Sequence, residues 1–132
     1  MKLGIAQATT AKIKVTVESF FEQKSSDASR NEYAFAYRIT IENKSNHPVQ
    51  LRSRFWHIVD TLSANKEVEG EGVIGEQPVI IPSGKFQYMS YCLLSSEIGK
   101  MEGWYIFKDL VTQSSFRVMI PAFCLQTQSR LN

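Results

Sequence analysis

The sequence predicts an all-β fold, an antiparallel β-sandwich of seven to eight strands. Apolar and polar residues alternate along several stretches of the 132 residues, as they do in half-buried strands. Turn-forming residues separate these stretches at short intervals, and no stretch has helical periodicity. The length suits one domain with its own core. We expect a loose leader over residues 1–10, a sandwich domain over 11–125 and a polar tail over 126–132.

The first two predicted strands have the clearest alternation. One covers residues 13–21, and a polar turn over 23–31 leads to the next. That strand, over 33–42, places five apolar residues on one face. They are Tyr33, Phe35, Tyr37, Ile39 and Ile41.

The third predicted strand, over 49–61, follows a turn that ends at Pro48. Its apolar residues change parity between Leu51 and Trp56, so we expect a β-bulge near Ser53 that lets both ends bury their apolar side chains. Trp56 then occupies the position at which immunoglobulin-like sandwiches often bury a tryptophan.

The second half of the chain supplies the remaining strands. Short strands are expected over 67–69 and 79–81, and longer ones over 86–94, 101–108 and 116–120, the last ending at Pro121. Both faces of 86–94 are apolar, which favours a central strand or one that is covered on its outer side. Residues 95–100 form a loop that has room for one helical turn.

Three of the seven glycines form a G-x-G-x-x-G pattern with Gly70, Gly72 and Gly75. In dinucleotide-binding folds this pattern precedes a helix whose N-terminus holds a pyrophosphate. Here Pro78 and Pro82 follow four residues apart, which the interior of a helix does not tolerate, and the residues between them favour a strand. The pattern therefore predicts a turn between strands.

Three interpretations of this turn remain open. The glycines can serve only the backbone path between strands. Alternatively, the N–H groups around Gly70, Gly72, Val73 and Gly75 form a nest that binds phosphate. The third interpretation is a Mg²⁺ site formed by the neighbouring carboxylates, since hard cations prefer oxygen ligands. These are Glu69, Glu71 and Glu76.

A surface for a protein partner is also expected. Trp104 lies on the face of its strand opposite Tyr105, and we expect it to form an exposed apolar patch with Tyr91. An unpaired edge strand is the other predicted contact, and it would also allow a homodimer. A net charge of +2 without a basic stripe argues against nucleic acid as the partner.

Composition and motifs indicate where in the cell the protein acts and which kinds of site it lacks. The first residues lack the apolar core of a signal peptide, no apolar run reaches the length of a membrane span, and Cys92 and Cys124 are expected to be buried thiols. We therefore expect a cytoplasmic protein without membrane insertion. His47 and His57 lack metal-ligand spacing, and no motif brings a nucleophile and a base together, so we expect no enzyme.

Three motifs follow one another along the chain: the run Arg54-Phe55-Trp56-His57-Ile58, the segment 69–78 around the glycines, and Met101-Glu102-Gly103-Trp104-Tyr105. In this order they resemble the bacterial ApaG family, and the likeness extends from about Ile13 to Leu125. The resemblance implies a fibronectin type III-like sandwich with the glycines in a loop. It also implies a link to cobalt and magnesium tolerance, and a role in protein binding rather than catalysis.

Together these observations predict a non-enzymatic domain that acts by binding a protein partner. The alternative is a sensor that binds phosphate, pyrophosphate or a nucleotide through the glycine turn, with or without Mg²⁺. No resident cofactor is expected.

Overall fold

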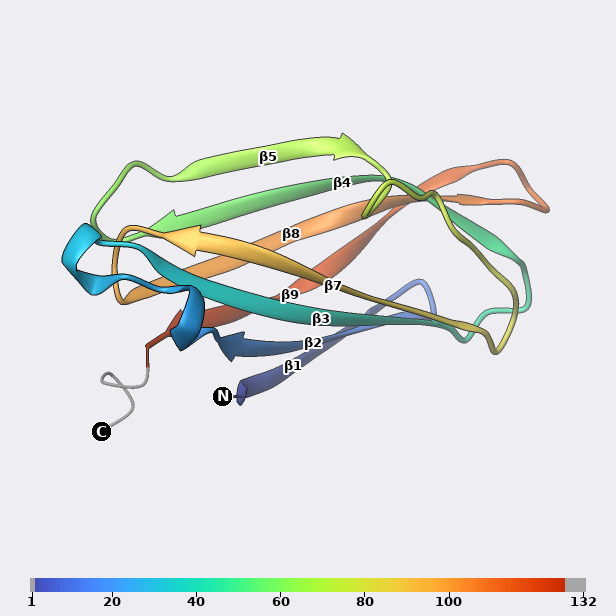
Figure 1. The fold of residues 1–132 in the computed structure, drawn as a ribbon. Helices are drawn as coiled ribbons and strands as arrows, with labels where there is room; N and C mark the ends of the chain where they lie inside the picture. The colour runs from blue at the N-terminus through green and yellow to red at the C-terminus, as the bar shows by residue number, and fades with distance from the viewer. Residues whose placement is uncertain (1, 128–132) are drawn as a thin grey trace.

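The computed structural model describes residues 2–127 and forms two antiparallel sheets packed face to face (Figure 1). The first sheet has the order β1-β2-β3-β7 and the second the order β5-β4-β8-β9, with the short β6 also pairing with β4. The strands of the first sheet are β1 (Lys2–Thr10), β2 (Ile13–Phe21), β3 (Tyr33–Asn43) and β7 (Lys85–Leu94). Those of the second are β4 (Val49–Asp60), β5 (Lys66–Glu71), β6 (Val79–Ile80), β8 (Ile98–Asp109) and β9 (Ser115–Gln126).

This architecture confirms the predicted all-β sandwich. The described residues form nine strands, one more than the upper expectation, and their only helical pieces are two 3-10 turns, η1 (Gln23–Ser25) and η2 (Ala28–Arg30). No helix within residues 2–127 is long and apolar enough to cross a membrane.

The core lies between the sheets, where the alternating apolar residues meet. The five apolar residues of β3 all turn inward, as expected, and Trp56 is only 3% exposed. The ring of Trp56 packs edge-on against Tyr37 and Phe123. Tyr88 of the first sheet and Tyr105 of the second form a hydrogen bond of 2.6 Å across the core.

Two irregularities adjust the second sheet. The β4–β8 register shifts between Leu51 and Ser53, which confirms the predicted bulge. The β8–β9 register shifts between Met101 and Gly103. There Pro121 lies in a second bulge, and β9 continues beyond it. The prediction that this strand ends at Pro121 is wrong, because a bulge removes the need for a ladder hydrogen bond from proline.

The predicted loose leader is also wrong. Residues 2–10 form β1, which pairs with β2 along most of its length. Backbone hydrogen bonds make this strand, and Leu3 and Ala6 pack on the core. The apolar alternation is weak because β1 is an edge strand with small and polar residues. At the other end Gln126 closes β9 and Thr127 is buried, while residues 128–132 of the predicted tail lie outside the described residues.

Three further expectations need correction. β7 is an edge strand and is not central. Its outward side chains are exposed, so it is not covered either. The segment 95–100 contains no helical turn, since β8 begins at Ile98. Cys124 is exposed and Cys92 is partly buried, and both thiols are free.

Candidate interaction site

The glycine motif forms a tight hairpin turn over residues 73–76, on the path between β5 and β6, which both pair with β4. Val73 and Glu76 exchange two backbone hydrogen bonds of 2.8 Å, and Ile74 and Gly75 between them have φ angles of +43° and +77°. Two central residues with positive φ are the signature of a type I′ turn. Gly72 has a φ of +63°, and an added Cβ would lie 2.2 Å from the carbonyl oxygen of Glu76. The structure thus gives Gly72 and Gly75 clear backbone roles.

The N–H groups of the turn are largely used within the protein. The N–H of Gly72 donates to the carbonyl oxygen of Arg52. The N–H of Val73 donates to the carbonyl oxygen of Glu76, and the N–H of Glu76 donates to that of Val73. Within the described chain, the N–H groups of the turn that remain available to an external anion are therefore those of Ile74 and Gly75. A phosphate nest uses successive free N–H groups, and most of the expected set is already engaged.

The three glutamates near the turn do not converge. Glu69 and Glu71 follow each other on the outer face of β5, and Glu76 belongs to the hairpin. Among the described residues, no three His, Cys, Asp or Glu side chains lie close enough together to hold a metal ion. The donor set does not fit Mg²⁺.

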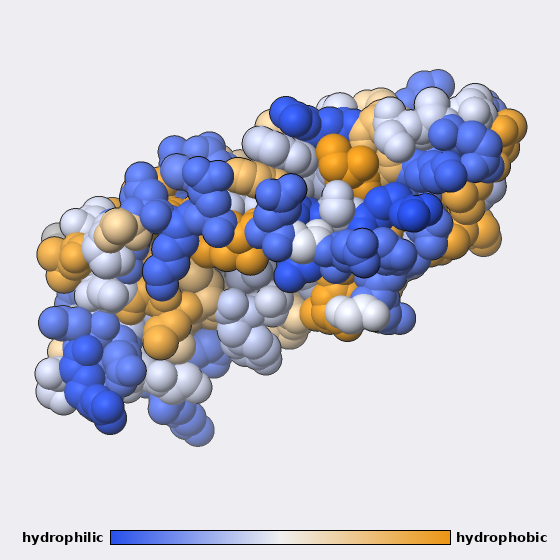
Figure 2. All heavy atoms as spheres, turned by 90° about the horizontal axis from the view of Figure 1, so that it is seen from above, coloured by the Kyte–Doolittle hydropathy of each residue, from blue (hydrophilic) through white to orange (hydrophobic). Residues whose placement is uncertain are grey.

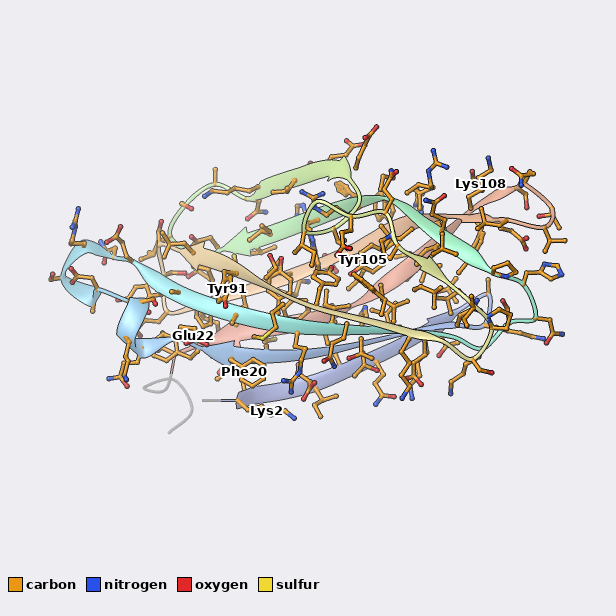
Figure 3. All side chains as sticks on the ribbon, turned by 45° about the vertical axis from the view of Figure 1, so that its right-hand side comes forward. Lys2, Phe20, Glu22, Tyr91, Tyr105 and Lys108 are labelled. Carbon is orange, nitrogen blue, oxygen red and sulfur yellow. The ribbon has the colours of Figure 1, made fainter. Side chains whose placement is uncertain are left out.

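Trp104 lies on the outer face of the second sheet, between two partners. Its ring stacks on Phe55 with centroids 4.3 Å apart, and the guanidinium of Arg117 lies 4.0 Å above its centroid. Both ring faces are therefore covered. The structure does not bring Trp104 together with Tyr91, because Tyr91 lies on β7 of the other sheet (Figure 3).

An exposed apolar row lies on β7 itself. Its outward side chains are Met89, Tyr91 and Leu93, which are 41%, 69% and 54% exposed. Among the described strands, β7 pairs with β3 alone, so its other edge presents unpaired backbone N–H and C=O groups. An apolar row and an open backbone edge thus coincide on one strand.

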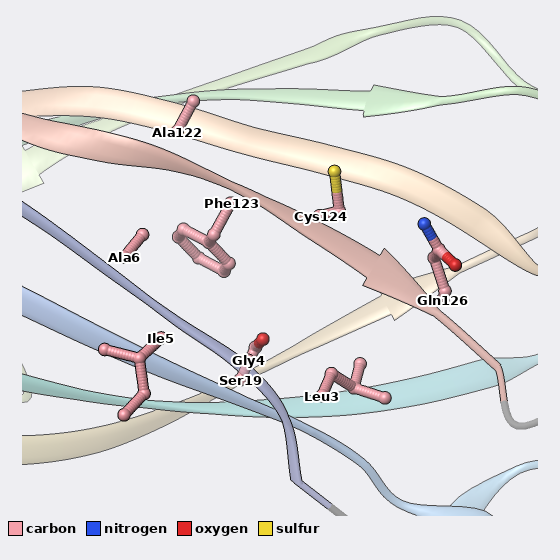
Figure 4. A pocket seen from close by; sticks show the side chains of 9 residues that line it. All are labelled: Leu3, Gly4, Ile5, Ala6, Ser19, Ala122, Phe123, Cys124 and Gln126. Atoms are coloured by element: carbon pink, nitrogen blue, oxygen red, sulfur yellow. The ribbon is translucent and has the colours of Figure 1, made fainter. Parts of the chain in front are cut away.

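The sandwich is open at this edge and closed at the opposite one. On the closed side β1 lies against β9, and the N–H of Met119 donates to Oγ1 of Thr10 at 3.2 Å. A small hollow remains there, into which Phe123 projects from β9 toward β1 (Figure 4). On the open side β4 and β5 extend beyond β7, as the ribbon shows (Figure 1).

A cleft of about 380 Å³ occupies the open side, between β7 and the inner faces of β4 and β5. Hydrophobic residues show between hydrophilic ones along this edge (Figure 2). Trp56 and Tyr37 form the floor, and Val68 of β5 forms part of one wall. Ser90 to Leu94 of β7 form the other wall.

Arg54 brings a positive charge into this cleft. It shares the inward face of β4 with Trp56 and is half-buried. Its Nη1 donates to the carbonyl oxygens of Gly72 at 2.8 Å and Glu71 at 3.1 Å. No carboxylate of the described chain forms an ion pair with it. Arg54 therefore fixes the glycine turn and keeps an uncompensated charge.

Among the described residues that line the cleft, the one acidic side chain already has its hydrogen-bond partners. Asp60 accepts hydrogen bonds from the backbone of Leu62 and Ser95 and from the hydroxyls of Ser63 and Ser96. Burial raises the pKa of Asp60, but these hydrogen bonds outweigh it and the net shift is downward. Asp60 thus stays ionised without Arg54.

Sequence reasoning missed Arg54 as a site residue. The available signal was parity, since Arg54 precedes Trp56 by two residues and must share its inward face. His47, for which no metal-ligand spacing was found, lies 2.8 Å from the carboxylate of Asp109. This hydrogen bond lowers the pKa of Asp109 to about 2.

The fold and the glycine turn define an immunoglobulin-like β-sandwich domain with a G-x-G-x-x-G hairpin. The chain belongs to the ApaG domain family, whose sequence profile matches residues 23–109. This confirms the resemblance found in the sequence.

Curated relatives and solved structures agree with this assignment. The chain is 44% identical to Protein ApaG of Brucella suis over 118 residues, which cover 89% of this chain and 90% of that one. It is 41% identical to Protein ApaG of Sodalis glossinidius, with 92% and 96% covered. A crystal structure of a Bordetella pertussis protein named ApaA superposes with a TM-score of 0.84 at 37% identity, covering 88% and 94%.

Proposed function

We propose that this ApaG-domain chain is a non-enzymatic interaction domain that binds an extended segment of a protein partner along β7. The segment would add as a further strand to the first sheet. In this mode, backbone hydrogen bonds supply affinity and alternate side chains supply specificity.

The lack of edge protection on β7 carries this proposal. Natural sheets protect their edges with charged residues, prolines, bulges or covering elements. The other edges of this sandwich have such devices: β5 has four charged residues among six, β9 has the Pro121 bulge, and β1 lies against β9. β7 has a regular register with β3, no proline, and a charge only at its first residue, Lys85.

The proposed link to cobalt and magnesium tolerance is indirect. The partner would supply this link, because the described His, Cys, Asp and Glu side chains form no cluster that could hold a metal ion. The alternative, a phosphate sensor in which the carboxylates bind Mg²⁺, has less support from the turn, whose N–H groups are mostly engaged.

An amide NMR titration tests the proposal. The probes are three nine-residue peptides of alternating valine and threonine, acetylated and amidated, with glutamate, glutamine or lysine at the centre. We expect at least one of them to shift amides of residues 85–94 in a saturable way. If none does at about millimolar peptide, the affinity range of weak complexes, the proposal fails.

Two methionines of similar exposure give a matched control. Met89 lies on the outer face of β7 and is 41% exposed, while Met119 lies on the outer face of β9 and is 44% exposed. Met89→Lys should weaken peptide binding roughly tenfold, since it places a charge beside the outward apolar side chains of the added strand. Met119→Lys should leave binding unchanged. A dimer that Met89→Lys converts to a monomer would instead identify a second copy as the partner.

A further inference from the structure

The position of β4 and β5 determines where the side chains of an added strand would point. Both strands extend beyond β7, so a strand that pairs with β7 lies beneath their inner faces (Figure 1). Successive side chains of a strand alternate between the two faces of the sheet. Every second side chain of the partner would therefore enter the cleft, and the others would lie beside Met89 and Tyr91.

Charged and apolar side chains follow a defined order along the inner faces of β4 and β5. Register pairs Arg54 with Gly70, Trp56 with Val68 and Ile58 with Lys66, so each pair shares the inward face. Val68 is 38% exposed although it points inward, because no strand of the described chain covers it. A cation thus lies at the end of the cleft next to the glycine turn, followed by an apolar stretch.

The charge at Arg54 is the most selective feature of the cleft. A guanidinium has five N–H donors. The described hydrogen bonds of Arg54 both come from Nη1 and both go to neutral carbonyl oxygens of the turn. Its positive charge has no carboxylate partner, and Lys66 adds a second cation at the rim. Charge complementarity therefore favours an anionic group as the occupant.

We infer that the partner segment carries an acidic residue on its inward face, bound by Arg54, with an apolar residue two positions away that packs on Trp56 and Val68. This inference rests on the proposed strand addition to β7 and specifies its sequence preference. The acidic residue would lie next to the glycine turn, so the turn and the partner would share one arginine.

The three probe peptides test the inference on the full chain. The glutamate peptide should bind wild type at least tenfold more tightly than the glutamine peptide, and the lysine peptide should bind most weakly. The glutamate preference should decrease as salt is added, since screening weakens a half-exposed ion pair. Neither measurement needs a variant, so neither depends on how a substitution affects folding.

Matched substitutions of two arginines test whether Arg54 causes the preference for the glutamate peptide. Arg54→Gln should abolish it, and Arg54→Lys should restore part of it. Arg52→Gln removes the same charge from an exposed side chain of β4 whose described hydrogen bond goes only to Gln50, and it should keep the preference intact.

The inference and the proposed function can fail separately. Equal binding of the glutamate and glutamine peptides with shifts at β7 would overturn the acidic preference and leave strand addition standing. A glutamate preference that Arg54→Gln does not change would overturn the role of Arg54. Absence of β7 shifts with all three peptides would overturn the proposed function itself.

Discussion

The hydroxyl oxygens of Tyr88 and Tyr105 lie 2.6 Å apart in the core and join the two sheets through a buried hydrogen bond. Tyr88 comes from β7 and Tyr105 from β8, so the bond anchors the proposed binding strand to the opposite sheet. Burial raises the pKa of both side chains. Both hydroxyls therefore stay neutral, and one donates its hydrogen bond to the other.

Removing one hydroxyl of this pair should destabilise the fold. Tyr105→Phe leaves the Tyr88 hydroxyl buried without its partner, and we expect a loss of about 1–2 kcal/mol in the free energy of unfolding. The double variant with Tyr88→Phe should lose less than the sum of the two single variants, because no orphaned group remains. Urea denaturation measures all three. Strict additivity would show that the hydroxyls do not interact.

Gly72 and Gly75 should differ in their tolerance of alanine. Both have positive φ, but a Cβ at Gly72 would lie 2.2 Å from the Glu76 carbonyl oxygen, whereas nothing lies within 4 Å of one at Gly75. We expect Gly75→Ala to cost about 1 kcal/mol from backbone strain and Gly72→Ala more than about 2 kcal/mol. Equal losses in chemical denaturation would contradict this description of the turn.

Acid should weaken the outer face of the first sheet through Glu18. The side chain of Arg38 first, and that of Lys2 second, donate to its carboxylate at 2.8 Å and lower the pKa of Glu18 from 4.5 to about 2. A depressed carboxyl pKa stabilises the fold above the unfolded value, and this contribution is lost as pH falls from about 4.5 to about 2.

Glu18→Gln removes that pH dependence. Between about pH 5 and pH 2, the wild type should lose on the order of 1 kcal/mol more unfolding free energy than the variant, after allowance for solvent screening. Urea denaturation at several pH values makes the comparison. Parallel pH profiles of the two proteins would show that Glu18 titrates normally in the folded state.

The two thiols should react at very different rates. Cys124 is exposed on β9, whereas burial raises the pKa of the partly buried Cys92 to about 11. Since the thiolate is the reactive species, iodoacetamide at neutral pH should label Cys124 roughly ten times faster. Mass spectrometry of the labelled peptides gives both rates, and Cys124→Ser provides the slow rate alone. Similar rates at the two positions would argue against the burial of Cys92.

Local periodicity explains which parts of the fold could be predicted. The strand at Tyr33–Asn43 and the bulge near Ser53 follow from alternation and from its break, both of which are properties of neighbouring residues. The strand at Lys2–Thr10 escaped prediction because its pairing with β2 depends on backbone hydrogen bonds and not on an apolar face.

The candidate site depends on which strands become neighbours. β7 resembles a central strand by composition, and only the sheet order shows that its edge is open. The separation of Tyr91 and Trp104 on different sheets is likewise a consequence of topology. The inward position of Arg54 could be predicted because it lies two residues before Trp56 on the same strand. Its hydrogen bond to the carbonyl oxygen of Gly72 could not, because it depends on how the turn folds back onto β4.

Amide hydrogen exchange along β7 tests strand addition most directly. In the free chain, alternate N–H groups of residues 85–94 should exchange quickly, because those on the open edge have no partner strand. Binding of the tightest probe peptide should protect these alternate amides and leave residues 70–76 unchanged. Protection confined to 70–76, with no change in β7, would contradict strand addition and place the binding site at the glycine turn.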